Sequence, residues 1–168
     1  MISPNANEDE RIQDVKIREH ARSLRNKYPK SGLYLVGKSE KSLWSIDWYS
    51  GKVWLSNDGS YLISSNGISN LNDKNEIRLD SQVLSFYFEG KESRIYRFSD
   101  LVKNSSKLPG APRFVFWACR GTFDEINDRF TVVTFDFQEH VFESDGQLVS
   151  TTGLSKIPCN SPFDIQFE

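Results

Sequence analysis

Residues 43–64 read LWSIDWYSGKVWLSNDGSYLIS and hold three of the four tryptophans of the chain. Two turn signals divide this stretch, Ser50-Gly51-Lys52 and Asn57-Asp58-Gly59. An Asp-Gly pair between β-forming residues favours a tight hairpin, because Gly adopts positive φ at little cost and Asp or Asn tolerates it. The stretch therefore predicts a three-stranded antiparallel meander with one aromatic face.

Short runs of β-forming residues, separated by turn residues, continue from this meander to residue 153. Phe114 to Cys119 reads FVFWAC, and six consecutive apolar residues predict a strand that is buried on both faces at the centre of the core. Strands that follow one another by hairpins favour an up-and-down arrangement. The predicted fold is mainly β: an antiparallel up-and-down meander that forms a sandwich or a barrel, with one N-terminal α-helix.

The same reading divides the chain into four parts. Residues 1–7 are polar and predict a flexible tail. Residues 8–28 predict a helix that packs on the domain, because acidic residues begin it, apolar residues recur with helical spacing and Pro29 ends it. Residues 32–153 are predicted to form the antiparallel β domain, and residues 154–168 a C-terminal extension.

Composition narrows the class of protein. Charge is balanced, with 21 basic against 23 acidic residues and a net charge of −2, so the basic excess typical of nucleic-acid binding is missing. No apolar run approaches the ~20 residues of a membrane-spanning helix, so we expect a soluble single-domain protein. Met1 is the only methionine and a tail-like segment follows it, which is consistent with an exported protein whose signal peptide is not part of this sequence. The compartment otherwise stays open.

Two hairpins of the chain have similar sequences, LSNDGSYLI at residues 55–63 and FESDGQLV at residues 142–149. They resemble the Ser-x-Asp-Gly turns of propeller blades, although a propeller needs at least ~4 four-stranded blades and 168 residues leave little room for them. From Val53 to Val149 the order of strands and turns also resembles uncharacterised bacterial β-rich proteins. That resemblance implies a β fold and transfers no function or site.

The strongest catalytic candidates are His140 and Asp136. A Ser-His-Asp hydrolase could use them together, because His140 opens a hairpin strand beside the turn that holds Asp136. The sequence has no Gly-rich phosphate loop and no Gly-x-Ser-x-Gly elbow. Its two His and two Cys residues have no paired spacing, so we expect neither a metal site nor a cofactor.

The aromatic residues give a second candidate site. Trp44 and Trp48 alternate onto one face of their strand, and Trp54 or Tyr61 could join them by cross-strand pairing. Turned toward water, such rings could stack on sugars or bind a protein partner. Turned inward, they belong to the core, which the polar residues at alternate positions favour.

The two cysteines leave two interpretations open. Cys119 and Cys159 are either buried reduced thiols or a disulfide that ties the C-terminal segment to a central strand, which would indicate an oxidising compartment.

Three functions follow from these observations. The leading hypothesis is a non-catalytic binding module of bacterial origin, whose partner is an unknown protein or small ligand. The alternatives are a small hydrolase that uses His140 with nearby carboxylates, and a carbohydrate-binding module that uses exposed Trp rings. The oligomeric state stays open.

Overall fold

A computed structural model of the chain describes residues 15–28, 30–35, 41–48, 52–65, 68–70, 76–111, 114–156 and 166–167. The chain forms two compact units, one of Met1–Gly51 with Glu89–Lys91 and one of Lys52–Phe88 with Glu92–Glu168. The predicted boundaries of tail, helix, β domain and C-terminal extension stay a prediction, because residues 1–14 and most of the last fifteen residues lie outside the described ranges.

The first unit contains the main helix and a two-stranded sheet. It consists of α1 (Val15–Lys27), β1 (Ser31–Tyr34) and β2 (Ser42–Ile46), with β1 and β2 antiparallel. The backbone N–H of Tyr28 donates to the Leu24 carbonyl over 2.8 Å, so the helical bonding continues to the residue before Pro29. The Tyr28 ring then packs edge-on against Tyr34, with 4.8 Å between the ring centroids. The predicted helix is confirmed over Val15–Lys27, whereas its predicted start at residue 8 lies outside the described residues.

The predicted three-stranded meander of residues 43–64 is wrong in its first pairing. β2 pairs with β1 and not with β3 (Val53–Leu55). Gly32 permits this pairing, because a Cβ at this position would stand only 2.3 Å from the Trp44 carbonyl oxygen. A residue without a side chain lets β1 approach β2 this closely. The predicted turn at Ser50-Gly51 lies outside the described residues.

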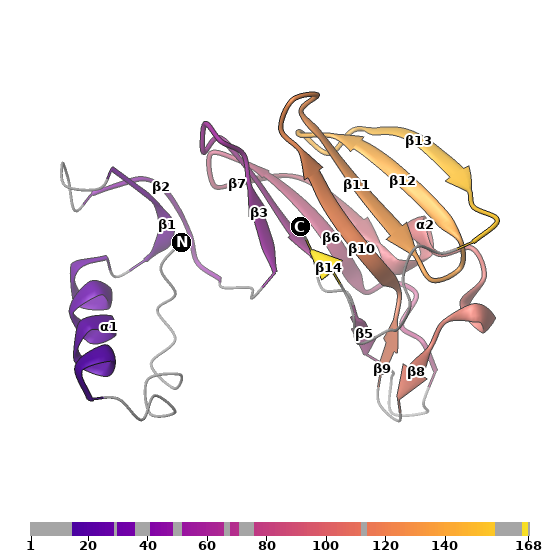
Figure 1. The fold of residues 1–168 in the computed structure, drawn as a ribbon, viewed down its shortest axis with the longest axis horizontal. Coiled ribbons are helices and arrows are strands. Elements are labelled where there is room, and N and C mark those ends of the chain that lie inside the picture. The colour runs from indigo at the N-terminus through magenta and orange to yellow at the C-terminus, as the bar shows by residue number, and fades with distance from the viewer. Residues whose placement is uncertain are drawn as a thin grey trace. The chain divides into compact units, whose positions relative to one another are not determined.

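The second unit contains the two larger sheets (Figure 1). The four-stranded sheet has the order β3-β4-β6-β7, and its further strands are β4 (Tyr61–Ser65), β6 (Gln82–Phe88) and β7 (Lys91–Arg97). The five-stranded sheet has the order β13-β12-β11-β10-β14, with β10 (Ala118–Asp124), β11 (Arg129–Thr134), β12 (Gln138–Glu143), β13 (Leu148–Gly153) and β14 (Gln166–Phe167). A small sheet has the order β5-β9-β8, with β5 (Ile68–Asn70), β8 (Gly110–Ala111) and β9 (Phe114–Phe116). The predicted class, mainly β with antiparallel sheets and one main helix near the N-terminus, is confirmed.

Two hairpin turns, one of them the predicted Asn57-Asp58-Gly59 turn, have the positive φ values of tight turns. At the β3–β4 hairpin Gly59 has a φ of +74°, and Asp58 Oδ1 accepts hydrogen bonds from the backbone N–H of Ser60 and from the hydroxyl of Ser56. At the β6–β7 hairpin Glu89 and Gly90 both have positive φ, as a two-residue turn of type I′ requires.

One strand pairing is parallel and not antiparallel as predicted, because β14 runs in the same direction as β10.

The two larger sheets share one core of aromatic and aliphatic side chains. Phe86 from β6 lies 6.1 Å from Phe130 of β11 and 5.3 Å from Phe142 of β12, measured between ring centroids. The predicted core centre at Phe114–Cys119 is confirmed for Trp117 to Cys119, which are fully buried. It is not one strand, however: the run divides at Trp117 between β9 and β10, which belong to different sheets.

Candidate functional site

Asp136 is a buried carboxylate in the turn between β11 and β12. Its Oδ2 accepts hydrogen bonds from the backbone N–H groups of Lys103, at 2.8 Å, and Asn104, at 3.0 Å. Its Oδ1 accepts a hydrogen bond from the Thr134 hydroxyl at 2.5 Å. These bonds hold the segment after the short helix α2 (Phe98–Leu101) against the β11–β12 turn. The carboxylate is thus fully engaged in holding the fold together.

His140 lies on β12, and its ring is buried. Its Nε2 stands 2.9 Å from the Leu101 carbonyl oxygen, and its Nδ1 stands 3.0 Å from the Thr151 hydroxyl. A carbonyl only accepts, so Nε2 carries the proton and donates, while Nδ1 accepts from Thr151. Burial is the main cause that lowers the pKa of His140 below its ordinary value, and Lys103 adds to this, against the Leu101 carbonyl and Asp136, which raise it. The ring is therefore neutral near pH 7.

Together, His140 and Asp136 hold the C-terminal end of α2 and the segment after it. His140 bonds to the Leu101 carbonyl, and Asp136 bonds to the backbone N–H groups of Lys103 and Asn104. Among the described residues, no hydrogen bond joins the side chain of His140 to that of Asp136, although the charge of Asp136 reaches the imidazole. Both ring nitrogens of His140 are already bonded, so a substrate would have to displace Leu101 or Thr151 to reach one. A catalytic role for His140 and Asp136 stays a prediction that this geometry does not favour.

The four predicted binding aromatics belong to different units. Trp44 and Trp48 are half-buried in the first unit, and Trp54 and Tyr61 are half-buried in the second. The Trp54 ring packs on Phe130 with 4.7 Å between centroids, so Trp54 borders the core that the two larger sheets share. Tyr61 packs on Phe88 at 5.1 Å. The binding face stays a prediction. The contact of Trp54 with Phe130 gives this residue a structural role in the packing of the core.

Cys119 is fully buried and disulfide-bonded. Cys159 lies outside the described residues, so its pairing with Cys119 stays a prediction.

The acidic turn between β10 and β11 satisfies its carboxylates with its own backbone and neighbours. Asp124 accepts hydrogen bonds from the Asn127 side chain and from the backbone N–H groups of Asn127 and Ile126, and these bonds, the first most strongly, lower the pKa of Asp124. Asp128 Oδ2 accepts from the Ser144 hydroxyl at 2.7 Å, and Glu125 accepts from the Asn57 side chain. No group of three or more His, Cys, Asp or Glu residues in the described part of the chain is placed to hold a metal ion.

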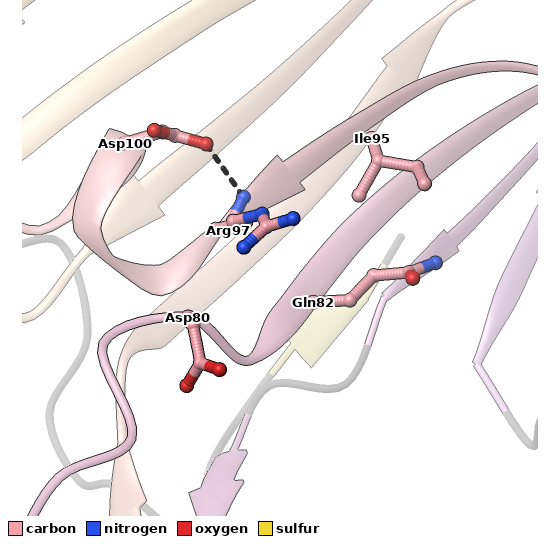
Figure 2. Close-up of a pocket in the computed structure, with 5 residues that line it drawn as sticks. All are labelled: Asp80, Gln82, Ile95, Arg97 and Asp100. Atoms are coloured by element: carbon pink, nitrogen blue, oxygen red, sulfur yellow. Dashed lines mark hydrogen bonds between the residues drawn. The ribbon is translucent and has the colours of Figure 1, made fainter.

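An open pocket of about 480 Å³ lies beside the start of β6 and the end of β7 (Figure 2). Five exposed residues line it: Asp80, Gln82, Ile95, Arg97 and Asp100. The backbone N–H of Arg97 donates to Asp100 Oδ2 at 2.7 Å, and this bond fixes the first turn of α2 (Figure 2). The pocket mixes both charges and has no buried polar group, so its lining does not select one class of ligand. No sequence pattern predicts this pocket, because its residues come from two stretches of the chain, 80–82 and 95–100.

Two outer strands of the larger sheets, β7 and β13, are almost wholly exposed. Six of the seven residues of β7, KESRIYR, are exposed, and four of the seven carry a charge. All six residues of β13, LVSTTG, are exposed, and none carries a charge. Leu148 and Val149 at its start keep 40% and 45% of their surface in contact with water. The sequence signal for this edge is a run of six uncharged residues that follows the Asp145-Gly146 turn.

Comparison with known proteins adds little to this geometry. No protein-family model and no curated protein matches the chain. Among solved structures, it is similar to the β-propeller domain of Cps50 (Swd1) from Myceliophteria thermophila, with a TM-score of 0.33 and 12% identity. The match covers 83% of this chain and 46% of that domain, so the chain spans less than half of the domain's length. Similarity at this level carries no conclusion about function.

No helix in the described part of the chain has the length and the apolar character that crossing a membrane requires.

Proposed function

We propose that this chain is a non-catalytic interaction module that binds a protein partner along the outer edge of β13. One observation carries the proposal: β13 is an exposed edge strand without a single charged residue. The edge of a sheet presents backbone N–H and C=O groups that can pair with an extended segment of another chain. Natural proteins usually block such edges with charges, and an edge without them is suited to strand addition.

The contrast within this molecule supports the choice of edge. β7 is the outer strand of the four-stranded sheet and carries Lys91, Glu92, Arg94 and Arg97. A partner strand would have to desolvate or pair these charges. At β13 it would meet only hydroxyl and aliphatic side chains, with Leu148 and Val149 as apolar contacts. The side chains of His140 and Asp136 are hydrogen-bonded to groups of the fold itself, which supports a binding module over the hydrolase alternative.

The test uses linear peptides displayed on phage as the probe, selected against the purified full chain. Bound peptides are expected to slow hydrogen exchange of the backbone amides of Leu148–Gly153, because those amides gain hydrogen-bond partners or lose solvent. Ser150→Lys is expected to weaken peptide binding at least tenfold, since it places a charge on the edge. Ser155→Lys adds the same charge at an exposed position just beyond β13 and is expected to leave binding unchanged.

Selected peptides that protect another segment, or that bind Ser150→Lys as well as the parent chain, would overturn the proposal. A glycan set that shifts the tryptophan emission, with no peptide bound at β13, would favour the carbohydrate-binding alternative instead.

A further inference from the structure

The charges of the two exposed edges decide which of them can pair with itself. In an antiparallel pair of two identical strands, the residues on either side of the centre face each other. With β7 centred on Arg94, the Arg94 side chains of the two copies would meet, and Lys91 of each copy would face Arg97 of the other. Like charges directly opposite each other destabilise a strand pair. In this register β7 is protected against a second copy of itself, whereas a register that places Glu92 opposite Arg94 would bring opposite charges together.

The edge β13 has no such protection. In every antiparallel register within Leu148–Gly153, the facing side chains are aliphatic groups, hydroxyl groups or the hydrogen of Gly153. Val149, Thr151 and Thr152 are β-branched and suit an extended conformation. Gly153 has no atom within 4 Å of the position of an added Cβ, so a facing side chain meets open space there.

The pairing of β12 with β13 shows which part of the edge is regular. Val141 faces Ser150 and Phe142 faces Leu148, so Val149 is the extra residue of a bulge. A bulge bends its strand locally. The regular part of the edge is therefore Ser150–Gly153, with Leu148 and Val149 at its rim.

We infer that the partner which pairs with β13 is a second copy of this chain, and this inference rests on the proposed function. Two copies related by a two-fold axis present the same edge to each other, so the contact closes at a dimer. β13 paired with β7 would instead leave one edge open at each end and continue into a filament. The closed pair joins the two five-stranded sheets into one continuous sheet across the dimer.

The strength of this contact follows from its length. Stable interfaces bury about 800 Å² on each partner, and one short edge strand supplies less than that. The dimer is therefore expected to form reversibly, with a dissociation constant on the order of micromolar or weaker, as for other small interfaces.

The test measures the mass of the full chain by light scattering over a range of concentrations. The mass is expected to rise toward twice that of one chain as the concentration increases. Ser150→Lys and Ser150→Glu are each expected to raise the dissociation constant at least tenfold, because each places a charge on the edge that the other copy would have to desolvate. Ser155→Lys is the matched control and is expected to dimerise like the parent chain.

A parent chain that stays monomeric over this range, while selected peptides still protect β13 from hydrogen exchange, would overturn the second copy as partner and keep the interaction module. A dimer that Ser150→Lys leaves intact would also overturn the inference, because its contact must lie elsewhere. A monomer that binds no peptide at β13 would overturn both proposals.

Discussion

Gly146, in the β12–β13 turn, lies directly against the ring of Phe86 on β6. A Cβ added to Gly146 would stand 2.6 Å from Cγ of Phe86, which is too close for any side chain. Gly146 also has a φ of +90°, and its carbonyl oxygen accepts a hydrogen bond from the Tyr96 hydroxyl at 2.8 Å. The glycine of this Asp-Gly turn therefore serves two purposes, because it gives the turn its backbone conformation and lets one sheet pack on the other.

Replacing Gly146 with Ala should lower the free energy of unfolding by about 2–4 kcal/mol, the sum of backbone strain at positive φ and overpacking against Phe86. Gly153→Ala is the matched control, because Gly153 has no atom within 4 Å of an added Cβ, and its effect should stay within about 0.5 kcal/mol. Urea unfolding of both variants measures the difference. An equal loss of unfolding free energy in Gly146→Ala and Gly153→Ala would contradict the close packing of Gly146 against Phe86.

His140 should make the stability of the fold depend on pH. Burial lowers the folded pKa of His140 below its ordinary value of 6.5, so below about pH 6.5 the unfolded chain takes up a proton on His140 that the folded chain does not. The free energy of unfolding should therefore fall on acidification, by up to about 1.4 kcal/mol per pH unit, until the folded pKa is reached. Above pH 6.5 this contribution is fully present.

Urea unfolding of the parent chain and of His140→Gln at about pH 7 and about pH 5.5 isolates this effect, because glutamine does not titrate. The variant should be less stable at both values, since it loses the fitted bonds to Leu101 and Thr151, and it should lack the part of the slope that His140 supplies. Identical slopes in the two chains would show that His140 is not buried in its neutral form.

Asp136 should be essential for the position of the segment after α2. In Asp136→Asn, the side chain loses its negative charge and keeps one acceptor oxygen in place of two, so the backbone N–H groups of Lys103 and Asn104 lose their charged acceptor. The free energy of unfolding should fall by about 2–4 kcal/mol, as expected when buried donors lose a charged acceptor. The amides of Lys103 and Asn104 should then exchange faster with solvent.

Asp80→Asn makes the same chemical change at an exposed carboxylate and should leave both stability and exchange almost unchanged. Unaltered exchange at Lys103 and Asn104 in Asp136→Asn would mean that the turn between β11 and β12 does not hold this segment.

The class of fold could be predicted from local patterns, whereas one strand pairing could not. The Asp-Gly turns at Gly59 and Gly146 could be predicted from the sequence, because the residues of the turn themselves favour positive φ at these positions. The pairing of β2 with β1 is instead permitted by Gly32, which lies twelve residues before Trp44 in the chain and allows a close backbone approach. Nothing in the periodicity of residues 43–49 distinguishes pairing with β1 from pairing with β3.

The bonding partners of His140 and Asp136, and the importance of the β13 edge, could not be predicted for a related reason. His140 and Asp136 can be recognised in the sequence because imidazole and carboxylate groups act as bases in catalysis. Their hydrogen-bond partners Leu101, Lys103 and Asn104 lie more than thirty residues away in the chain, so these bonds cannot be predicted from local sequence. Only the structure shows that these partners occupy both side chains. The edge β13 contains no reactive residue, and its one signal in the sequence is the lack of charge in LVSTTG.

Cys119 should form its disulfide with Cys159, the second cysteine of the sequence, and so fix the C-terminal segment to β10. Closing a loop of forty residues should stabilise the fold by about 3–4 kcal/mol through the lower entropy of the unfolded chain. Peptide mapping without reductant should yield the two cysteines in one cross-linked product. Cys159→Ser should lose about 2–5 kcal/mol of unfolding free energy. A thiol reductant should lower the parent chain to the level of this variant and leave the variant itself unchanged, because no cross-link remains in it to break. Two reactive thiols in the denatured, unreduced parent chain would contradict the pairing and return Cys119 to the class of buried reduced cysteines.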